Sequence, residues 1–243
     1  MSRNIKLEIE YDGTEFYGWQ VQPKLRTVQG EIQERLKTIL GHEINLIGAG
    51  RTDVGVHALG QVANFKTDNP LDGESILRGL NGLLADDVVI KKVQEVDPDF
   101  HARYSATSRR YKYRIYPGRT AVLRRYAWEV LYSLNLDKIA EATEEIQGEH
   151  DFSSFCVAES SKENSSCRVT EATWERSGDE LIFKIEANRF LHTMVRSLVG
   201  TLVEIGRGYF PVADFVNIMK ARDRRKAGPT APARGLYLVE VKY

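Results

Sequence analysis

The sequence contains little cysteine, and this lack and others like it exclude several classes of protein. Cys156 and Cys167 are the only two cysteines, too few for a disulfide framework or a cysteine-rich zinc site. No cysteine, histidine or carboxylate residues cluster at the spacing of metal ligands. Gly48-Ala-Gly50 lacks the third glycine of a dinucleotide fingerprint, and no P-loop lysine motif occurs. We therefore expect neither a metal nor a cofactor.

Long apolar runs are missing as well. No stretch approaches the roughly 18 to 20 consecutive apolar residues of a membrane span, and no basic segment followed by an apolar run opens the chain. Apolar residues make up 42% of the sequence and charged residues 28%, which is typical of globular proteins. These features predict a cytoplasmic protein without a membrane partner.

The chain also lacks net charge, but its charges are unevenly distributed. It has 34 basic and 34 acidic residues. Basic residues gather in two clusters, the first between His101 and Arg125 and the second between Lys220 and Lys226. The second cluster contains Asp223 as its only acid. Such segregation predicts a positive face for a polyanion, although a charge run is also typical of a plain solvated surface. The first cluster has no acid between His101 and Arg125 and consists of Arg103, Arg109, Arg110, Lys112, Arg114, Arg119, Arg124 and Arg125.

Apolar periodicity predicts the element order β-α-β-β-α-β in each half of the chain. The pattern indicates an α+β fold of two ferredoxin-like halves, residues 1–105 and 106–243, with mainly antiparallel sheets merged into one continuous sheet and helices on one side. The polar stretch Ser153–Ser166 is predicted to be a loop. In the first half we expect strands over 5–11, 44–47, 62–65 and 88–96, with helices from the Thr27 cap to Gly41 and over 74–84. In the second half we expect strands over 111–115, 168–176, 181–187 and 237–243, with helices over 136–147, 189–205 and 212–222.

The loop Gly48–His57 is the first of three candidate sites. Its glycines make the backbone pliable, and an extended backbone would point Arg51 and Asp53 to the same side. The alternative is a turn-forming aspartate beside a solvated arginine. His57 and His101 are more typical of structural residues, and neither has a serine or cysteine partner that would indicate a hydrolase triad.

The second candidate is the segment Arg109–Tyr116. As a strand it would carry Tyr111 and Tyr113 on one face and basic residues on the other. Aromatic rings that stack on bases beside cations that meet phosphates are a common means of binding single-stranded nucleic acid. Tyrosines in a strand are also ordinary core residues.

The third candidate is the apolar helix predicted to begin at Arg189. Arg189, His192, Arg196 and Gly200 recur at spacings of three, four and four residues, which places them on one stripe. This stripe could present Arg196 to a carboxylate, or it could be an ordinary surface.

Together these motifs resemble the tRNA pseudouridine synthase A family. They occur in the order of the family and span nearly the whole chain. One departure is Val54 after the aspartate, where the family usually has alanine or lysine; it leaves the chemical groups unchanged. The matching segments are Tyr11–Thr14, Gly18–Gln20, Gly50–His57, Phe100–Arg103, Arg110–Tyr113, Phe152–Phe155, Ala187–Gly200 and Gly235–Leu238.

The resemblance implies isomerisation of uridine to pseudouridine at positions 38, 39 and 40 of the tRNA anticodon stem-loop, by a homodimer that needs no cofactor. It implies that Asp53 is the catalytic carboxylate, that Tyr111 packs on the target uracil and that Arg196 pairs with Asp53. Arg51 would take the place of the flipped base. The expected substrate-binding residues are Arg51, Tyr111, Arg110, Lys112, His57 and Arg189.

Two other functions remain open from the residues alone. A non-catalytic RNA-binding protein could use the same basic, tyrosine-rich segment. An aspartate-dependent nucleoside glycosidase would usually need a second carboxylate, and none lies beside Asp53 in the sequence.

Overall fold

The computed structural model describes residues 2–157 and 165–243, which form two compact units. The first unit extends to Thr107 and also includes Tyr237–Tyr243, and the second comprises Ser108–Leu236. The division after Thr107 lies close to the predicted boundary between 105 and 106. The last strand differs from the prediction, because Tyr237 and Leu238 pair in parallel with the first unit.

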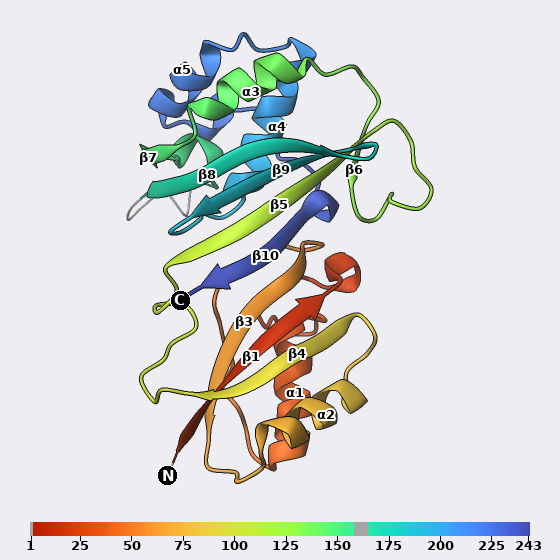
Figure 1. Cartoon of the computed structure of the whole chain (residues 1–243), viewed down its shortest axis with the longest axis vertical. Helices are drawn as coiled ribbons and strands as arrows, with labels where there is room; N and C mark the ends of the chain where they lie inside the picture. The colour runs from red at the N-terminus through yellow and green to blue at the C-terminus, as the bar shows by residue number, and fades with distance from the viewer. Residues whose placement is uncertain (1, 158–164) are drawn as a thin grey trace. The chain divides into compact units, whose positions relative to one another are not determined.

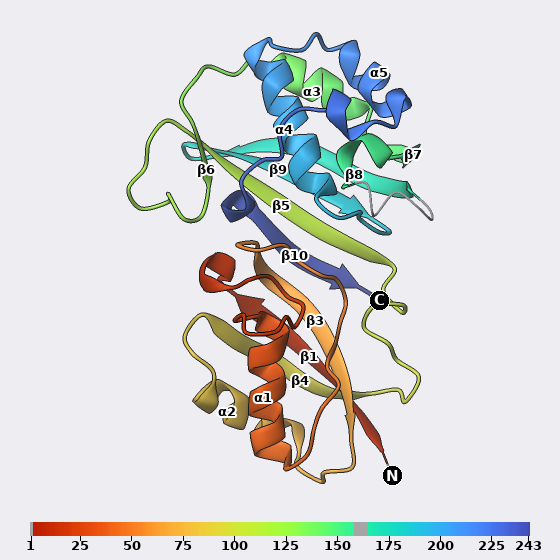
Figure 2. The same ribbon diagram turned by 180° about the vertical axis from the view of Figure 1, so that it is seen from behind.

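The first unit is a sheet covered on one face by two helices (Figures 1 and 2). The strand order is β4-β1-β3, and both β2 and β10 (Leu236–Lys242) pair with β3 as well. The predicted order β-α-β-β-α-β and the α+β class are confirmed. The elements are β1 (Arg3–Tyr11), α1 (Val28–Leu40), β2 (Ile47–Gly48), β3 (His57–Thr67), α2 (Gly73–Leu83) and β4 (Val88–Val96).

Local signals in the sequence define the ends of α1. The Thr27 side chain accepts a hydrogen bond from the Gly30 amide, and Gly41 ends the helix in the left-handed conformation with φ 79°. Both positions were predicted, because a threonine cap and a terminal glycine satisfy the free backbone groups of a helix. Between these ends, the buried side chains Ile32 and Leu36 recur four residues apart and face the sheet.

In the described part of the second unit, a mainly antiparallel sheet is combined with three α-helices. Its strand order is β5-β9-β8-β7, and β6 pairs in parallel with β5. Ser153–Phe155, in the predicted loop, forms a 3-10 turn, while residues 158–164 of that loop lie outside the described part of the chain. The elements are β5 (Ser108–Pro117), β6 (Trp128–Val130), α3 (Leu136–Glu144), β7 (Gly148–Asp151), β8 (Ser166–Ser177), β9 (Glu180–Ala187), α4 (Met194–Arg207) and α5 (Asp214–Ala221).

Helix α4 begins at Met194, so the prediction that it begins at Arg189 was wrong. Thr193 stands before the helix with φ 66°, a left-handed conformation that an α-helix cannot contain. Upstream, the Asn188 side chain accepts a hydrogen bond from the Arg168 amide of β8. These constraints hold residues 188–193 in a turn, so Arg189 and His192 are not on the helical stripe with Arg196.

Glycine is required at position 200 because another backbone segment crosses α4 there. A Cβ on Gly200 would lie 1.7 Å from the Pro229 carbonyl oxygen. The Gly228 amide donates to the Thr201 hydroxyl, and the Ala231 amide donates to the Arg196 carbonyl. The segment that leads toward β10 is thereby fixed directly on α4. Across the described ranges, no helix has the length and apolar character needed to cross a bilayer.

We predict that Gly200→Ala destabilises the protein by about 2–3 kcal/mol, since overpacking of this kind forces the backbone apart. Gly82→Ala is the matched control. Gly82 lies inside α2, where a Cβ would meet nothing within 4 Å, so the substitution should stabilise by up to about 1 kcal/mol. Urea unfolding of both variants tests this, and equal stabilities would contradict it.

Candidate functional site

Asp53 occupies the first position of a tight turn. The Val56 amide donates to the Asp53 carbonyl at 3.2 Å, and Gly55, the third residue of the turn, has φ 76°, as such turns require. Thr52 is buried, whereas Arg51 is exposed and Asp53 half-buried. This alternation agrees with the expectation that Arg51 and Asp53 point away from the core on the same side.

The turn is anchored from below by Tyr11 at the end of β1. The buried hydroxyls of Tyr11 and Thr52 are hydrogen-bonded at 2.8 Å. Burial raises the pKa of Tyr11 to about 12, because the phenolate would lose its hydration. Thr52 thus serves as the inward-facing anchor between two outward-facing charged residues.

The segment Asp12–Gln20 packs along the other side of the turn. The Trp19 amide donates to the Thr52 carbonyl at 3.1 Å, and the Gly55 amide donates to the Phe16 carbonyl at 3.3 Å. Phe16 and Trp19 are buried, so their side chains fasten the segment to the core. The Asp53 turn is therefore fixed by backbone hydrogen bonds on both flanks.

Two glycines make this close packing possible. A Cβ on Gly13 would lie 2.0 Å from the Val56 carbonyl oxygen, and one on Gly18 would lie 2.7 Å from the Thr52 carbonyl oxygen. Gly18 also has φ 85°, which other residues rarely adopt. Any side chain at either position would push the segment off the turn. The motifs Tyr11–Thr14 and Gly18–Gln20 therefore have a physical role that the sequence reading did not assign.

His57 is buried, with 2% of its surface exposed, which argues against the expected contact with substrate. Its ring stacks on Tyr237 with centroids 4.6 Å apart. Its Nδ1 lies 3.1 Å from the Gly13 amide nitrogen and 3.0 Å from Asp12 Oδ1. One nitrogen cannot accept from the amide and donate to the carboxylate at once, but either bond ties His57 to the segment that holds the turn. This geometry supports a structural role.

In the second unit, Tyr111 and Tyr113 lie on one face of β5, as predicted. The Tyr111 ring, almost fully buried, meets Phe190 edge-on with centroids 5.0 Å apart. The Tyr113 hydroxyl donates to the Pro232 carbonyl at 2.7 Å, and burial raises its pKa. Tyr113 is a core residue, whereas Tyr111 contacts Phe190 in the turn that follows β9.

Two basic residues of β5, Arg110 and Arg114, have acidic partners on β9 and β8. Arg110 forms ion pairs with Glu186 at 2.8 Å and Glu171 at 3.1 Å, and Arg114 pairs with Glu180 at 2.7 Å. Strand pairing therefore compensates much of the charge that the sequence segregates. The expectation of a strongly positive face does not hold for this strand.

Lys112 has charges of both signs nearby, from Arg114 and Lys184 and from Glu180 and Glu175. It stands opposite Lys184 in the β5–β9 register. Burial, together with the nearby Arg114 charge, lowers the pKa of Lys112. A lysine in this position gains from an anion that approaches it.

Arg196 lies in the first turn of α4 and is oriented by the crossing segment. Its Nε donates to the Ala231 carbonyl at 2.8 Å, the same residue whose amide binds the Arg196 carbonyl. Arg189 and His192 are exposed on the turn before the helix. Of the four predicted stripe residues, Arg196 and Gly200 lie in the helix, and of these only Arg196 has a side chain to present.

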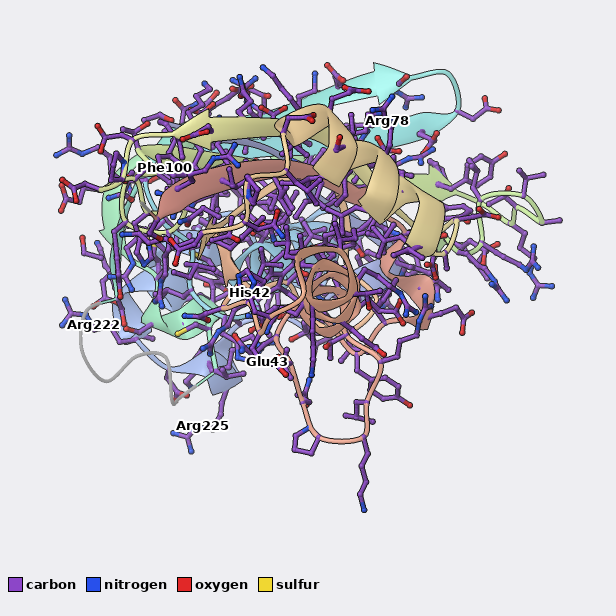
Figure 3. The ribbon with its side chains drawn as sticks, turned by 90° about the horizontal axis from the view of Figure 1, so that it is seen from below. His42, Glu43, Arg78, Phe100, Arg222 and Arg225 are labelled. Carbon is purple, nitrogen blue, oxygen red and sulfur yellow. The ribbon has the colours of Figure 1, made fainter. Side chains whose placement is uncertain are left out.

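The second basic cluster surrounds the end of α5, and its arginines Arg222 and Arg225 point away from the ribbon (Figure 3). Arg222 pairs with Asp151 at 2.9 Å and Arg225 with Asp223 at 2.8 Å. Hydrogen bonds from Arg225 lower the pKa of Asp223 to about 2. These exposed pairs are screened by solvent and contribute little to stability.

Neither cysteine has the features of a reactive group. Both are buried, and burial raises the pKa of Cys156 and raises that of Cys167 to about 11, which keeps the thiols protonated at neutral pH. Within residues 2–157 and 165–243, no three histidine, cysteine or carboxylate residues come together as metal ligands would.

Comparison with known proteins identifies matches over nearly the whole chain. A family model described as tRNA pseudouridine synthase matches residues 8–105 and 142–243, which includes Asp53 and Arg196 but not Tyr111. A tRNA pseudouridine synthase A from Acetivibrio thermocellus is 46% identical and covers 99% of this chain and 100% of its own. One from Geobacillus kaustophilus is 45% identical and covers 100% of this chain and 95% of its own.

Solved structures give more distant matches. The structure of an H/ACA ribonucleoprotein bound to a substrate RNA containing 2′-deoxyuridine covers 82% of this chain and 53% of its own, with 14% identity and a TM-score of 0.36.

We predict that Tyr11→Phe destabilises the protein by about 1–3 kcal/mol at neutral pH, because the Thr52 hydroxyl loses its buried partner. The raised pKa of Tyr11 means that the unfolded chain releases this proton first. The contribution of the protonated Tyr11 hydroxyl to the free energy of unfolding is present below about pH 10 and is lost as pH rises toward 12. Urea unfolding across this range should therefore show the difference between wild type and variant shrinking.

Tyr104→Phe, at an exposed tyrosine, is the control and should differ little from wild type at any pH. A Tyr11→Phe effect that stays constant between pH 9 and 11.5 would contradict the prediction.

Proposed function

This chain belongs to the tRNA pseudouridine synthase A family, whose members are isomerases, and we propose that it acts at positions 38, 39 and 40 of the tRNA anticodon stem-loop. The observation that carries the proposal is the Asp53 turn, which holds a half-buried carboxylate on a backbone fixed from both flanks. Such fixed placement favours reaction of a group with a bound base or sugar.

The reaction rearranges bonds within one nucleotide. The C1′–N1 bond breaks, the detached uracil turns over, and a C1′–C5 bond forms while C5 loses its proton and N1 regains one. Asp53 acts as the nucleophile toward the nucleotide, and no electron or group donor is needed. The balance of atoms is consistent with a mechanism that uses no cofactor.

The other proposed roles follow from family resemblance and side-chain chemistry. The target base must leave its stack, at a cost of a few kcal/mol, and the exposed Arg51 fills the space that it leaves. Tyr111 packs on the detached uracil, and its hydroxyl takes the C5 proton. Arg196 is the counter-ion that favours the ionised form of Asp53.

The remaining substrate contacts are phosphate contacts. We assign these to Arg189, which is exposed, and to Lys112. Arg110 contributes less, because Glu186 and Glu171 already neutralise it. The family resemblance implies that two subunits together form the tRNA-binding clefts, so the proposed active form is a homodimer. The proposed location of the protein is the cytoplasm.

We predict that Asp53→Asn lowers tritium release from tRNA labelled at uridine C5 by roughly a thousandfold or more, while tRNA binding changes by only a few fold. Asp86→Asn, at an exposed carboxylate of the same unit, should retain release. Substantial release by Asp53→Asn would refute the nucleophile assignment.

Nucleoside analysis of the same incubation distinguishes the alternatives. Pseudouridine in the product supports the synthase. Unchanged RNA with tight, salt-sensitive binding would favour a non-catalytic RNA-binding protein, and free uracil would favour a glycosidase.

We predict that Tyr111→Phe lowers tritium release by about a hundredfold or more, because the hydroxyl that takes the C5 proton is removed while the ring remains. Tyr113→Phe is the matched control on the same face of β5. It loses its bond to Pro232 and should cost about 1 kcal/mol of stability with release retained. Full release by Tyr111→Phe would exclude an essential role for its hydroxyl.

A further inference from the structure

The segment that holds the Asp53 turn carries one exposed aromatic ring. Phe16 and Trp19 are buried, but Tyr17 between them is 50% exposed. Since its neighbours are directed into the core, the Tyr17 ring is directed to solvent. Val54, the residue after Asp53, is 54% exposed. The surface around the carboxylate therefore includes two large apolar side chains that do not serve the core.

The position of Tyr17 relative to the turn is fixed through its backbone. Phe16, the residue before it, accepts a hydrogen bond from the Gly55 amide. Gly18, the residue after it, packs directly on Thr52 and Asp53, and a Cβ added to Gly18 would lie 3.3 Å from the Asp53 carbonyl carbon. Tyr17 lies between these two contacts. It is therefore adjacent to the Asp53 turn, and the two are held together by the same bonds.

The loop that follows fixes Tyr17 from its other side. The Tyr17 amide donates to the Arg26 carbonyl at 2.9 Å, and Gln22 Nε2 donates to the Tyr17 carbonyl at 2.9 Å. These bonds use only the Tyr17 backbone. A firmly held backbone with a half-exposed ring is suited to binding, because little side-chain entropy is lost when a partner covers it.

We propose that Tyr17 stacks on the base of a nucleotide that adjoins the target uridine in the substrate RNA. This inference rests on the proposed role of Asp53. When a base is extruded, its neighbours lose a stacking surface, and an aromatic side chain beside the reacting carboxylate can replace it. Stacking of one base on an aromatic ring changes affinity by roughly 5- to 150-fold. Val54 extends the apolar surface on the side of the turn.

The test uses an anticodon stem-loop RNA and compares Tyr17→Ala, Tyr17→Leu and Tyr17→Phe in single-turnover pseudouridine formation. Tyr17→Ala and Tyr17→Leu should raise the half-saturating RNA concentration roughly tenfold, with the rate at saturation within about threefold of wild type. Tyr17→Phe keeps the ring and should match wild type. Tyr209→Ala, at an exposed tyrosine after α4, is the control and should leave the half-saturating concentration unchanged.

A second arm removes the base instead of the ring. Two RNAs carry an abasic nucleotide, one on the 5′ side of the target and one on the 3′ side. One of the two should bind the wild-type protein more weakly than the intact RNA does. Tyr17→Leu should lose no further affinity for that RNA. Additive losses on both sides, or Tyr17→Leu binding of the intact RNA that equals that of wild type, would overturn the proposal, because a merely structural effect is independent of the missing base.

The two proposals fail separately. Wild-type protein that forms no pseudouridine would refute the proposed function, and equilibrium binding of the same RNAs would still decide whether Tyr17 stacks. Wild-type product formation together with an unaffected Tyr17→Ala variant would overturn the stacking role alone.

Discussion

The Asp53 turn depends on a backbone-to-backbone contact that only glycine permits. At Gly13 and Gly18 the segment after β1 comes so close to the turn that a Cβ would lie within 2.7 Å of a carbonyl oxygen. That proximity allows the hydrogen bonds of Trp19 and Gly55, and it brings Tyr17 beside the turn. Two positions without side chains thus determine where the carboxylate and the neighbouring ring lie. The tolerance for substitution is low here because the atoms in contact are backbone atoms, which cannot rotate away.

Sheet pairing changes the meaning of the charge pattern. Along the chain, the segment from His101 to Arg125 is strongly basic, but β8 and β9 bring Glu171, Glu180 and Glu186 beside Arg110 and Arg114. A cross-strand neighbour lies closer to a residue than most of its own segment does. Local charge at an RNA-binding surface must therefore be judged after the strands are paired.

The sequence predicted elements well where the signal is local. Thr27 and Gly41 mark α1, and alternation along Ile5, Leu7 and Ile9 marks β1, because caps and amphipathic periods need no distant partner. It failed at α4, where the Asn188 bond to Arg168 and the conformation of Thr193 depend on tertiary contacts. The partner of β10 was also beyond local reasoning. At the candidate site, the motif predicted a role for Asp53, but Tyr11 and Thr52, which anchor its turn, are 41 positions apart, and no pattern in the sequence joins them.

The glycines of the Gly48–His57 loop predicted a pliable backbone, and the structure supports a different interpretation. A Cβ on Gly48 would meet the Trp19 ring at 2.5 Å, and Gly55 is fixed in a hydrogen-bonded turn. These residues permit close packing instead of motion. Under the proposed function, a carboxylate that is already positioned need not be ordered when substrate binds, so the reorganisation would fall on the RNA, whose base would leave the stack. A rigid turn and an extruded base would then be complementary, and groups that stabilise the displaced RNA are expected on the same fixed segment as the carboxylate.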